Sequence, residues 1–229
     1  MGAIDAVILD LFGTLVPNFS LDRFWGCVDS VADVLGAPRT GFRAEWRATF
    51  RQRMNGTLRD GEEMFVPLLR KLGVAVDGAA LAEANRLRRD FMATELVPKD
   101  GAHECLVELR QRGYRLALAT DCSSDTPALL DRTPLGEFFA VRAVSAELGV
   151  TKPHAAMYEH VLAGLGVAGE ACVYVGDGNS EELPGAKRHG MTTVWVDNGE
   201  AQEWKDRFVP EADLTIRDLR ELPALVAGR

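Results

Sequence analysis

The sequence predicts an α/β protein with a doubly wound (Rossmann-like) parallel sheet and an α-helical cap inserted after the first strand. Two observations predict this class. Short apolar runs alternate with segments of helical character over most of the chain, which is typical of a parallel sheet covered by helices on both faces. Between residues 16 and 97, by contrast, helix-like segments follow one another with no convincing strand between them.

Six apolar runs are the expected strands. The run Ala6–Asp10 ends in an acid and is followed by Phe12-Gly13-Thr14, which indicates a buried strand that opens into a turn. The later strands are expected at Tyr114–Thr120, Ala140–Val144, Cys172–Val175, Thr192–Val196 and Leu214–Ile216. A closing helix is expected at Leu219–Val226.

The insertion between the first two strands is expected to be a separate helical unit. Its helices are predicted at Leu21–Leu35, Thr40–Met54, Glu62–Leu72 and Ala79–Ala93. The chain is therefore divided into an α/β core, residues 1–15 and 98–229, and a helical cap, residues 16–97. The cap carries 12 Lys+Arg and 11 Asp+Glu, whereas the core carries 14 and 23, so the cap is the better place to bind an anion.

Composition excludes several classes of function. The 229 residues carry a net charge of −8, so the positive surface that a nucleic-acid-binding protein needs is missing. No apolar run approaches the roughly 20 residues that cross a bilayer, and the start lacks the features of a secretion signal. The four cysteines are far apart, which favours neither a zinc site nor a disulfide framework. A cytoplasmic protein with no nucleic-acid or membrane partner is expected.

Polar residues follow the apolar runs at the positions where parallel sheets bind ligands. In such sheets ligands lie beyond the carboxyl ends of the strands. The residues found there are Asp10, Thr120 with Asp121, Lys152, and Gly176 with Asp177. A single Asp or Thr at such a position is usually a helix cap. Capping does not explain four successive polar ends, so a functional site is expected at this edge.

These residues resemble, in the same order, the four motifs of the haloacid dehalogenase-like hydrolases. The matching segments are Asp10–Leu15 (DLFGTL), Thr120, Lys152-Pro153 and Val175–Gly178 followed by Glu182. The resemblance covers nearly the whole chain, and the family places a small cap after its first strand. It implies these roles: Asp10 the nucleophile, Thr120 a hydroxyl that holds the transferring group, Lys152 its charge partner, Asp177 a metal ligand, and the Phe12 backbone carbonyl a further ligand.

The implied chemistry is physically coherent. A carboxylate that attacks a phosphoryl group is repelled by its negative charge, and a hard divalent cation such as Mg²⁺ removes this repulsion. Asp10, Asp177 and Glu182 would supply carboxylate ligands, although Glu181 beside Glu182 is an alternative. The hydroxyls of Thr14 and Thr120 can bond phosphoryl oxygens, and Asp121 is a further candidate for substrate binding. The expected route passes through an aspartyl phosphate.

Phe12 departs from the phosphatase pattern and leaves three hypotheses open. Phosphatases of the family carry a second Asp two residues after the nucleophile, and losing such a proton donor costs about 10²–10⁴-fold in rate. Dehalogenases of the family commonly have an aromatic residue there, because a halide leaves without a proton. The retained acids Asp177 and Glu182 favour magnesium-dependent hydrolysis of a small phosphorylated metabolite. The alternatives are a metal-independent 2-haloacid dehalogenase and a catalytically impaired member that binds a phospho-ligand or a protein.

Arg43, Arg47 and Arg51 form a basic stripe on a predicted cap helix. Such a stripe is usually a solvated face. The alternative is that Arg43 or Arg47 reaches the strand ends and binds a substrate carboxylate or second phosphate. The expected partner is therefore a small anionic metabolite, and the chain is expected to be a monomer or a homodimer.

Overall fold

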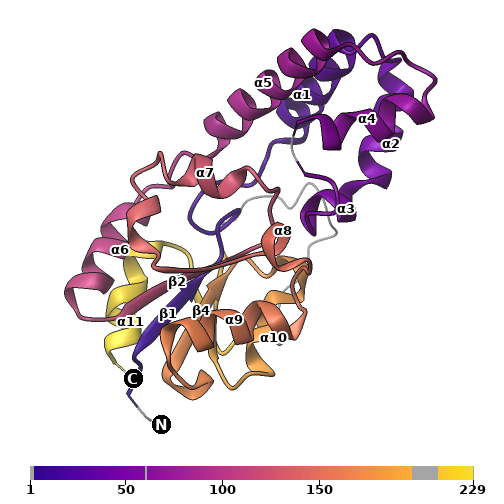
Figure 1. The fold of residues 1–229 in the computed structure, drawn as a ribbon. Coiled ribbons are helices and arrows are strands. Elements are labelled where there is room, and N and C mark those ends of the chain that lie inside the picture. Colours follow the sequence, from indigo (N-terminus) through magenta and orange to yellow (C-terminus); the bar gives the residue numbers. More distant parts are fainter. Residues whose placement is uncertain (1–2, 60, 198–210, 229) are drawn as a thin grey trace.

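The structure, a computed structural model, describes residues 3–59, 61–197 and 211–228. Its centre is a sheet of six strands in the order β3-β2-β1-β4-β5-β6, with every neighbouring pair parallel (Figure 1). The strands are β1 (Ala6–Leu9), β2 (Arg115–Thr120), β3 (Val141–Val144), β4 (Cys172–Gly176), β5 (Thr192–Val196) and β6 (Leu214–Ile216). The predicted doubly wound α/β class is confirmed, and the strand order changes direction at β1.

Helices cover both faces of this sheet. Along β1, Val7 and Leu9 pack into one hydrophobic cluster, whereas Ala6 and Ile8 pack into another, because successive strand residues point to opposite faces. The first cluster includes residues of α6 (Ala102–Gln111) and α11 (Leu222–Ala227), and the second includes residues of α9 (Ala155–Leu165) and α10 (Glu182–Lys187). None of the described helices is long and apolar enough to cross a membrane.

The stretch between β1 and β2 is a helical insertion with its own apolar cluster. It consists of α1 (Leu21–Val34), α2 (Arg39–Ala48), α3 (Phe50–Met54), α4 (Glu62–Lys71) and α5 (Gly78–Glu95). The cluster is built around fully buried side chains such as Phe42, Phe65 and Leu68. Figure 1 shows these helices beyond one end of the sheet. The division of the chain at residues 15/16 and 97/98 stays a prediction.

One predicted element of the insertion is wrong in detail. The single helix expected over Thr40–Met54 is two helices, α2 and α3, which meet at Thr49, where φ is −94° and ψ is 8°. Arg53 Nη1 donates to the Trp46 carbonyl and to Thr49 Oγ1, each at 2.7 Å. These side-chain bonds hold Arg53 of α3 against the end of α2.

The other boundaries differ less from the sequence prediction. Tyr114 and Ala140 lie just outside β2 and β3, and Gly176 extends β4 by one residue. The closing helix begins as a 3₁₀ turn, Leu219–Glu221, before α11. A 3₁₀ turn is a common start for an α-helix. The sequence therefore predicted a helical segment here but not its first 3₁₀ turn.

The insertion docks on the loops that follow β2 and β3. Ser145 Oγ, at the start of α8 (Ser145–Leu148), donates to the Met54 carbonyl at 2.6 Å. Arg88 of α5 forms a buried ion pair with Asp125, the residue before α7 (Thr126–Leu130). Figure 1 shows α3 near α8 and α5 near α7, in agreement with these contacts. The insertion therefore faces the carboxyl edge of the sheet.

Candidate active site

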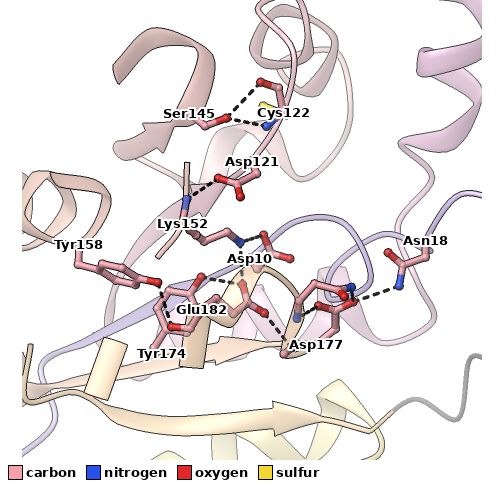
Figure 2. Close-up of polar contacts among 12 residues, drawn as sticks. Asp10, Asn18, Asp121, Cys122, Ser145, Lys152, Tyr158, Tyr174, Asp177 and Glu182 are labelled. Atoms are coloured by element: carbon pink, nitrogen blue, oxygen red, sulfur yellow. Dashed lines mark hydrogen bonds and ion pairs between the residues drawn. The ribbon is translucent and has the colours of Figure 1, made fainter. Parts of the chain in front are cut away.

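The carboxyl edge of the sheet brings the predicted polar residues into one group. Leu9 of β1 pairs with Leu118 of β2 and with Val175 of β4, so these three strands end at nearly the same level. One carboxylate oxygen from each of Asp10, Asp177 and Glu182 lies within 4.8 Å of the other two (Figure 2). The expectation that the strand ends share one site is met for these acids.

Lys152 lies at the centre of this group. Its Nζ donates to Asp10 Oδ1 and to Glu182 Oε2, each at 2.6 Å. The ammonium and both carboxylates are buried. Asp121 Oδ1 accepts from the backbone N–H of Lys152 at 3.0 Å and so fixes the loop that carries the lysine. Asp121 also lines the cavity described below, so it can contact a ligand there.

Glu182, rather than Glu181, belongs to the cluster. Tyr174 Oη donates to Glu182 Oε2, and the Gly178 N–H donates to Oε1, both at 2.9 Å. A Cβ on Gly176 would lie 2.1 Å from Glu182 Oε1, so the carboxylate fits only because residue 176 is glycine. Glu181 is exposed. The choice that the sequence left open is thereby decided by burial and hydrogen bonding.

Asp177 is held at the other side of the cluster by two asparagines. Asn179 donates to it through its backbone N–H at 2.9 Å and through Nδ2 at 2.5 Å, and Asn18 Nδ2 donates at 3.1 Å. Gly13, with a φ of +80°, passes so close that a Cβ there would lie 2.1 Å from Asp177 Oδ2. The turn after β1 thus needs glycine for both its backbone conformation and its clearance.

The charges of the cluster fit a divalent cation. Three buried carboxylates face one ammonium group, which leaves two negative charges without a described partner. Buried charges of one sign are costly unless they are paired or bind a metal. The donors are all oxygen atoms, which suits a hard cation such as Mg²⁺. The backbone carbonyl of Phe12, the further ligand implied by the sequence resemblance, stays a prediction.

Burial changes the acidity of these groups. It raises the pKa of Asp10 to about 6 and that of Glu182 to about 8, in both cases against the opposing charge of Lys152. Burial acts to lower the pKa of Lys152, but the charges of Asp10 and Glu182 outweigh it and raise the pKa well above its usual value. The lysine therefore stays charged. Without a bound cation, burial opposes the ionisation of Asp10 and Glu182, and a bound cation would favour it.

The two threonines of the predicted site are buried with unsatisfied hydroxyls. Thr14 Oγ1 and Thr120 Oγ1 have no hydrogen-bond partner among the described residues. Such groups are rare in proteins and call for an explanation. Both flank Asp10, one in the turn after β1 and the other at the end of β2, so phosphoryl oxygens held at Asp10 would offer them acceptors.

Phe12 lies between this cluster and the insertion. Its ring is partly buried, its centroid lies 4.9 Å from that of Phe19, and it also packs against Cys122 and Val144. It lines the cavity next to Asp10. The place where the sequence pattern would have a proton donor is therefore filled by an apolar ring.

A cavity of about 840 Å³ connects the cluster with the insertion. Asp10, Asp121 and Lys152 lie on the core side, and aromatic rings from α1, α2 and α5 lie on the insertion side. Arg47 lines the cavity and its guanidinium lies 4.4 Å from the centroid of the Trp25 ring. The placement of Arg47 permits the substrate contact expected of it.

Arg43 is placed differently from the sequence expectation. Its Nε and Nη2 donate to the two oxygens of Asp29 at 2.6 and 2.7 Å, and it is absent from the cavity lining. The expected contact with the strand ends is therefore wrong for Arg43, because its guanidinium already forms two hydrogen bonds with the carboxylate of Asp29 on α1. An i, i+4 stripe could not reveal a partner on another helix.

Several residues that shape the site were not found from the sequence. Asn18 and Tyr174 bond directly to the acids, yet a lone Asn or Tyr carries no motif. Tyr158 is fully buried and donates to the backbone carbonyl of Glu182 at 3.0 Å. The one available signal was Tyr174, a hydroxyl inside an otherwise apolar strand, since a buried tyrosine usually needs a hydrogen-bond partner.

The ordered motifs and their geometry agree with a comparison of the chain with known families. A model of the haloacid dehalogenase-like hydrolases matches residues 4–190. The chain belongs to this family. The resemblance that the sequence motifs suggested is confirmed, and the chain is hereafter a haloacid dehalogenase-like (HAD) hydrolase.

Related sequences of this HAD hydrolase are named as phosphatases. A phosphoserine phosphatase of Thermus thermophilus is 35% identical over 184 residues, which are 78% of this chain and 66% of that protein. A glyceraldehyde 3-phosphate phosphatase of Methanopyrus kandleri is 31% identical over 157 residues, 68% of this chain and 67% of that protein. The matches thus span about two thirds of the length of these relatives.

Solved structures share the fold of the HAD hydrolase but differ in their named chemistry. A HAD phosphatase from Thermococcus onnurineus aligns with a TM-score of 0.71 at 23% identity, over 99% of both chains. A 2-haloacid dehalogenase from Pseudomonas syringae aligns with a TM-score of 0.72 at 24% identity, over 98% of this chain and 99% of that one. The fold therefore does not distinguish phosphate transfer from dehalogenation.

Proposed function

We propose that this HAD hydrolase releases phosphate from a small phosphorylated metabolite, with bound Mg²⁺ and through an aspartyl phosphate on Asp10. The observation that carries the proposal is the buried cluster of Asp10, Asp177 and Glu182, whose net charge with Lys152 is negative. Displacement of a halide by a carboxylate develops no phosphoryl charge and has no use for such a cluster. The phosphatase names of the related sequences support the same choice.

Asp10 is the proposed nucleophile. One of its carboxylate oxygens attacks phosphorus, the bond from phosphorus to the leaving oxygen breaks, and water later attacks the same phosphorus to release phosphate and restore the carboxylate. Lys152 Nζ, 2.6 Å from Asp10 Oδ1, orients the nucleophile and balances charge. The hydroxyls of Thr14 and Thr120 would donate hydrogen bonds to the phosphoryl oxygens. When bound, the cation supplies electrostatic neutralisation between the carboxylates and the phosphoryl group.

Protonation of the leaving oxygen is the step in which this chain departs from the phosphatase pattern. Phe12 offers no proton, and the loss of a general acid costs about 10²–10⁴-fold for a leaving group that needs one. Phenolate and carboxylate leave without protonation. We therefore propose that the chain acts best on aryl or acyl phosphates.

A second candidate function is metal-independent dehalogenation of a 2-haloacid, which Phe12 favours because a halide needs no proton. One experiment separates the two. The purified protein is incubated with phenyl phosphate and acetyl phosphate in the presence of Mg²⁺ or EDTA, and with 2-chloropropionate in the presence of EDTA. Phosphate release that requires Mg²⁺, without chloride release, is the expected result. Chloride release in EDTA without phosphate release would establish the dehalogenase instead.

A third candidate is a member that binds a phospho-ligand or protein without turnover. It would be indicated by the absence of both phosphate and chloride release. We also propose a reducing, cytoplasmic location and an anionic metabolite as the partner; the cysteines Cys27, Cys105, Cys122 and Cys172 are all free thiols. Whether the chain is a monomer or a homodimer stays a prediction.

A further inference from the structure

The insertion side of the cavity contains two buried arginines that the proposed reaction does not use. Arg53 of α3 and Arg88 of α5 are 4% and 5% exposed, and both line the cavity. The other cavity arginines, Arg47 and Arg51, are exposed to solvent, which can balance their charge. Arginine is almost never buried without a paired group, so the two buried guanidiniums need an explanation.

Arg53 has no carboxylate partner among the described residues. Its hydrogen bonds run from Nη1 to the Trp46 carbonyl and to Thr49 Oγ1, and its guanidinium lies 3.8 Å from the centroid of the Trp46 ring. Burial and the nearby charge of Arg88 lower the pKa of Arg53 to about 9. The environment thus disfavours the charged form of a group that nearly always keeps its proton.

Arg88 and Trp46 add unsatisfied donors at the same wall. Arg88 pairs with Asp125 through Nη2, but its Nε has no hydrogen-bond partner among the described residues. The buried Nε1 of Trp46 also lacks one. Because Asp125 balances the charge of Arg88, the described residues leave one buried positive charge uncompensated at this wall, that of Arg53, together with donors that have no acceptor. A single carboxylate would balance the charge of Arg53 and supply acceptors to the unsatisfied donors.

The lining of the rest of the cavity indicates what kind of ligand could extend from this wall to the catalytic cluster. Rings of Phe12, Phe19, Phe24 and Phe91 also line the cavity. An aromatic body buries its surface well against such rings. A phenolic leaving oxygen also fits a site in which Phe12 stands where a proton donor would be needed.

We propose that Arg53 and Arg88 bind a carboxylate of the substrate, which is the phosphate ester of an aromatic acid. This rests on the proposed function for one point only, that the phosphoryl group lies at Asp10. Arginine binds carboxylates through two parallel hydrogen bonds, and a monoanion balances the single unpaired charge of Arg53. The substrate is therefore anionic at both ends, with a phosphate at the core and a carboxylate at the insertion.

The test uses a matched pair of ligands that cannot be hydrolysed, 4-(phosphonomethyl)phenylacetate and 4-(phosphonomethyl)phenylacetamide. Calorimetry with the Mg²⁺-loaded protein gives the dissociation constant of each. The acid is expected to bind about 10- to 100-fold more tightly than the amide, the range expected for hydrogen bonds to a charged group. Arg53→Met should abolish this preference and leave the affinity for the amide within about threefold, which also shows that the variant is folded.

Two further variants sharpen the result. Arg53→Lys keeps the charge but not the paired donors, so an intermediate preference for the acid is expected. Arg51→Met removes an exposed arginine of the same helix and should change the preference less than about twofold. Equal affinity of the wild-type protein for acid and amide would overturn the proposal, as would an Arg51→Met loss equal to that of Arg53→Met.

Turnover of phenyl phosphate, measured separately, keeps the two proposals apart. If phenyl phosphate is hydrolysed with Mg²⁺ but the acid is not preferred, the carboxylate site is refuted and the proposed function stands. If the acid is preferred through Arg53 and no phosphate ester is hydrolysed, the carboxylate site stands and the proposed function falls.

Discussion

The core side and the insertion side of the cavity carry buried charge imbalances of opposite sign. At the core, Asp10, Asp177 and Glu182 outnumber the single ammonium of Lys152. At the insertion, the buried Arg88 pairs with Asp125, whereas the buried Arg53 has no carboxylate partner among the described residues. Both imbalances cost free energy in the folded protein without a ligand. Together they select a cation at one end of the cavity and an anion at the other.

The two sides also differ in how completely they are organised. At the core each acid is oriented by fixed donors, such as Tyr174 for Glu182 and Asn18 for Asp177. At the insertion, Arg88 Nε and Trp46 Nε1 have no acceptor within the part of the chain that the structure describes. A preorganised group suits a reaction in which charge must be stabilised without rearrangement. Unsatisfied donors suit recognition, because they reject a ligand that lacks the matching acceptor.

The largest effect is expected from removing the nucleophile at the core. Asp10→Asn should lower kcat by about 10⁴-fold or more with phenyl phosphate, because the amide cannot form the phosphoenzyme. It leaves the ligand preference at the insertion intact. Phosphate release and the acid-over-amide preference, measured on the same preparation, check both statements. Retained turnover in this variant would remove Asp10 from the nucleophile role.

Phe12→Asp should produce the next largest effect, a gain. An acid at this position can protonate an alkoxide, so kcat/KM for an alkyl phosphate is expected to rise about 10²-fold. The rate with phenyl phosphate should change little, because its leaving group needs no proton. Steady-state kinetics with both esters test this difference. A gain that is equal for the two esters would show that Phe12 limits something other than proton transfer.

The sequence predicted the core side well because strand order and motif spacing determine it. Polar residues after β1, β2 and β4 must meet at one edge of a parallel sheet, and Asp10 and Asp177 do so. The choice between Glu181 and Glu182 could not be made, because it depends on the left-handed backbone at Ser180 and Glu181, with φ of 55° and 51°. Spacing along the chain does not reveal such a turn.

The insertion side was predicted poorly, for a physical reason. Its helices were located, but which of their arginines is buried depends on how helices pack, and periodicity along one helix does not determine that. Arg43 was expected to reach the site and instead pairs with Asp29. Arg53 was not predicted as a site residue, because it lies outside the four-residue spacing of the stripe formed by Arg43, Arg47 and Arg51.

When the metal is removed, the excess of buried carboxylates at the core should make the free energy of unfolding depend on pH. The pKa of Glu182 is about 8 in the folded metal-free protein, against 4.5 in the unfolded chain. Between these values the folded state binds more protons than the unfolded state, so the free energy of unfolding falls as pH rises. Asp10, whose pKa burial raises to about 6, acts in the same direction.

Urea unfolding in EDTA at several pH values between 4.5 and 8 measures this slope. Saturating Mg²⁺ should raise stability most at the upper end of the range, where the carboxylates are ionised most fully. Glu182→Gln provides the control, since an amide does not titrate and the slope should become shallower. Stability in EDTA that increases with pH over this interval would contradict the proposed burial of unpaired carboxylates.

The smallest effects are expected from the paired comparison of Arg47 and Arg43. Arg47 lines the cavity while exposed to solvent, so Arg47→Met should raise KM for 4-carboxymethylphenyl phosphate by about three- to tenfold and leave kcat nearly unchanged. Arg43→Met removes a guanidinium already paired with Asp29, so KM should change less than about twofold. A larger rise in KM for Arg43→Met than for Arg47→Met would mean that the ion pair with Asp29 opens when substrate binds.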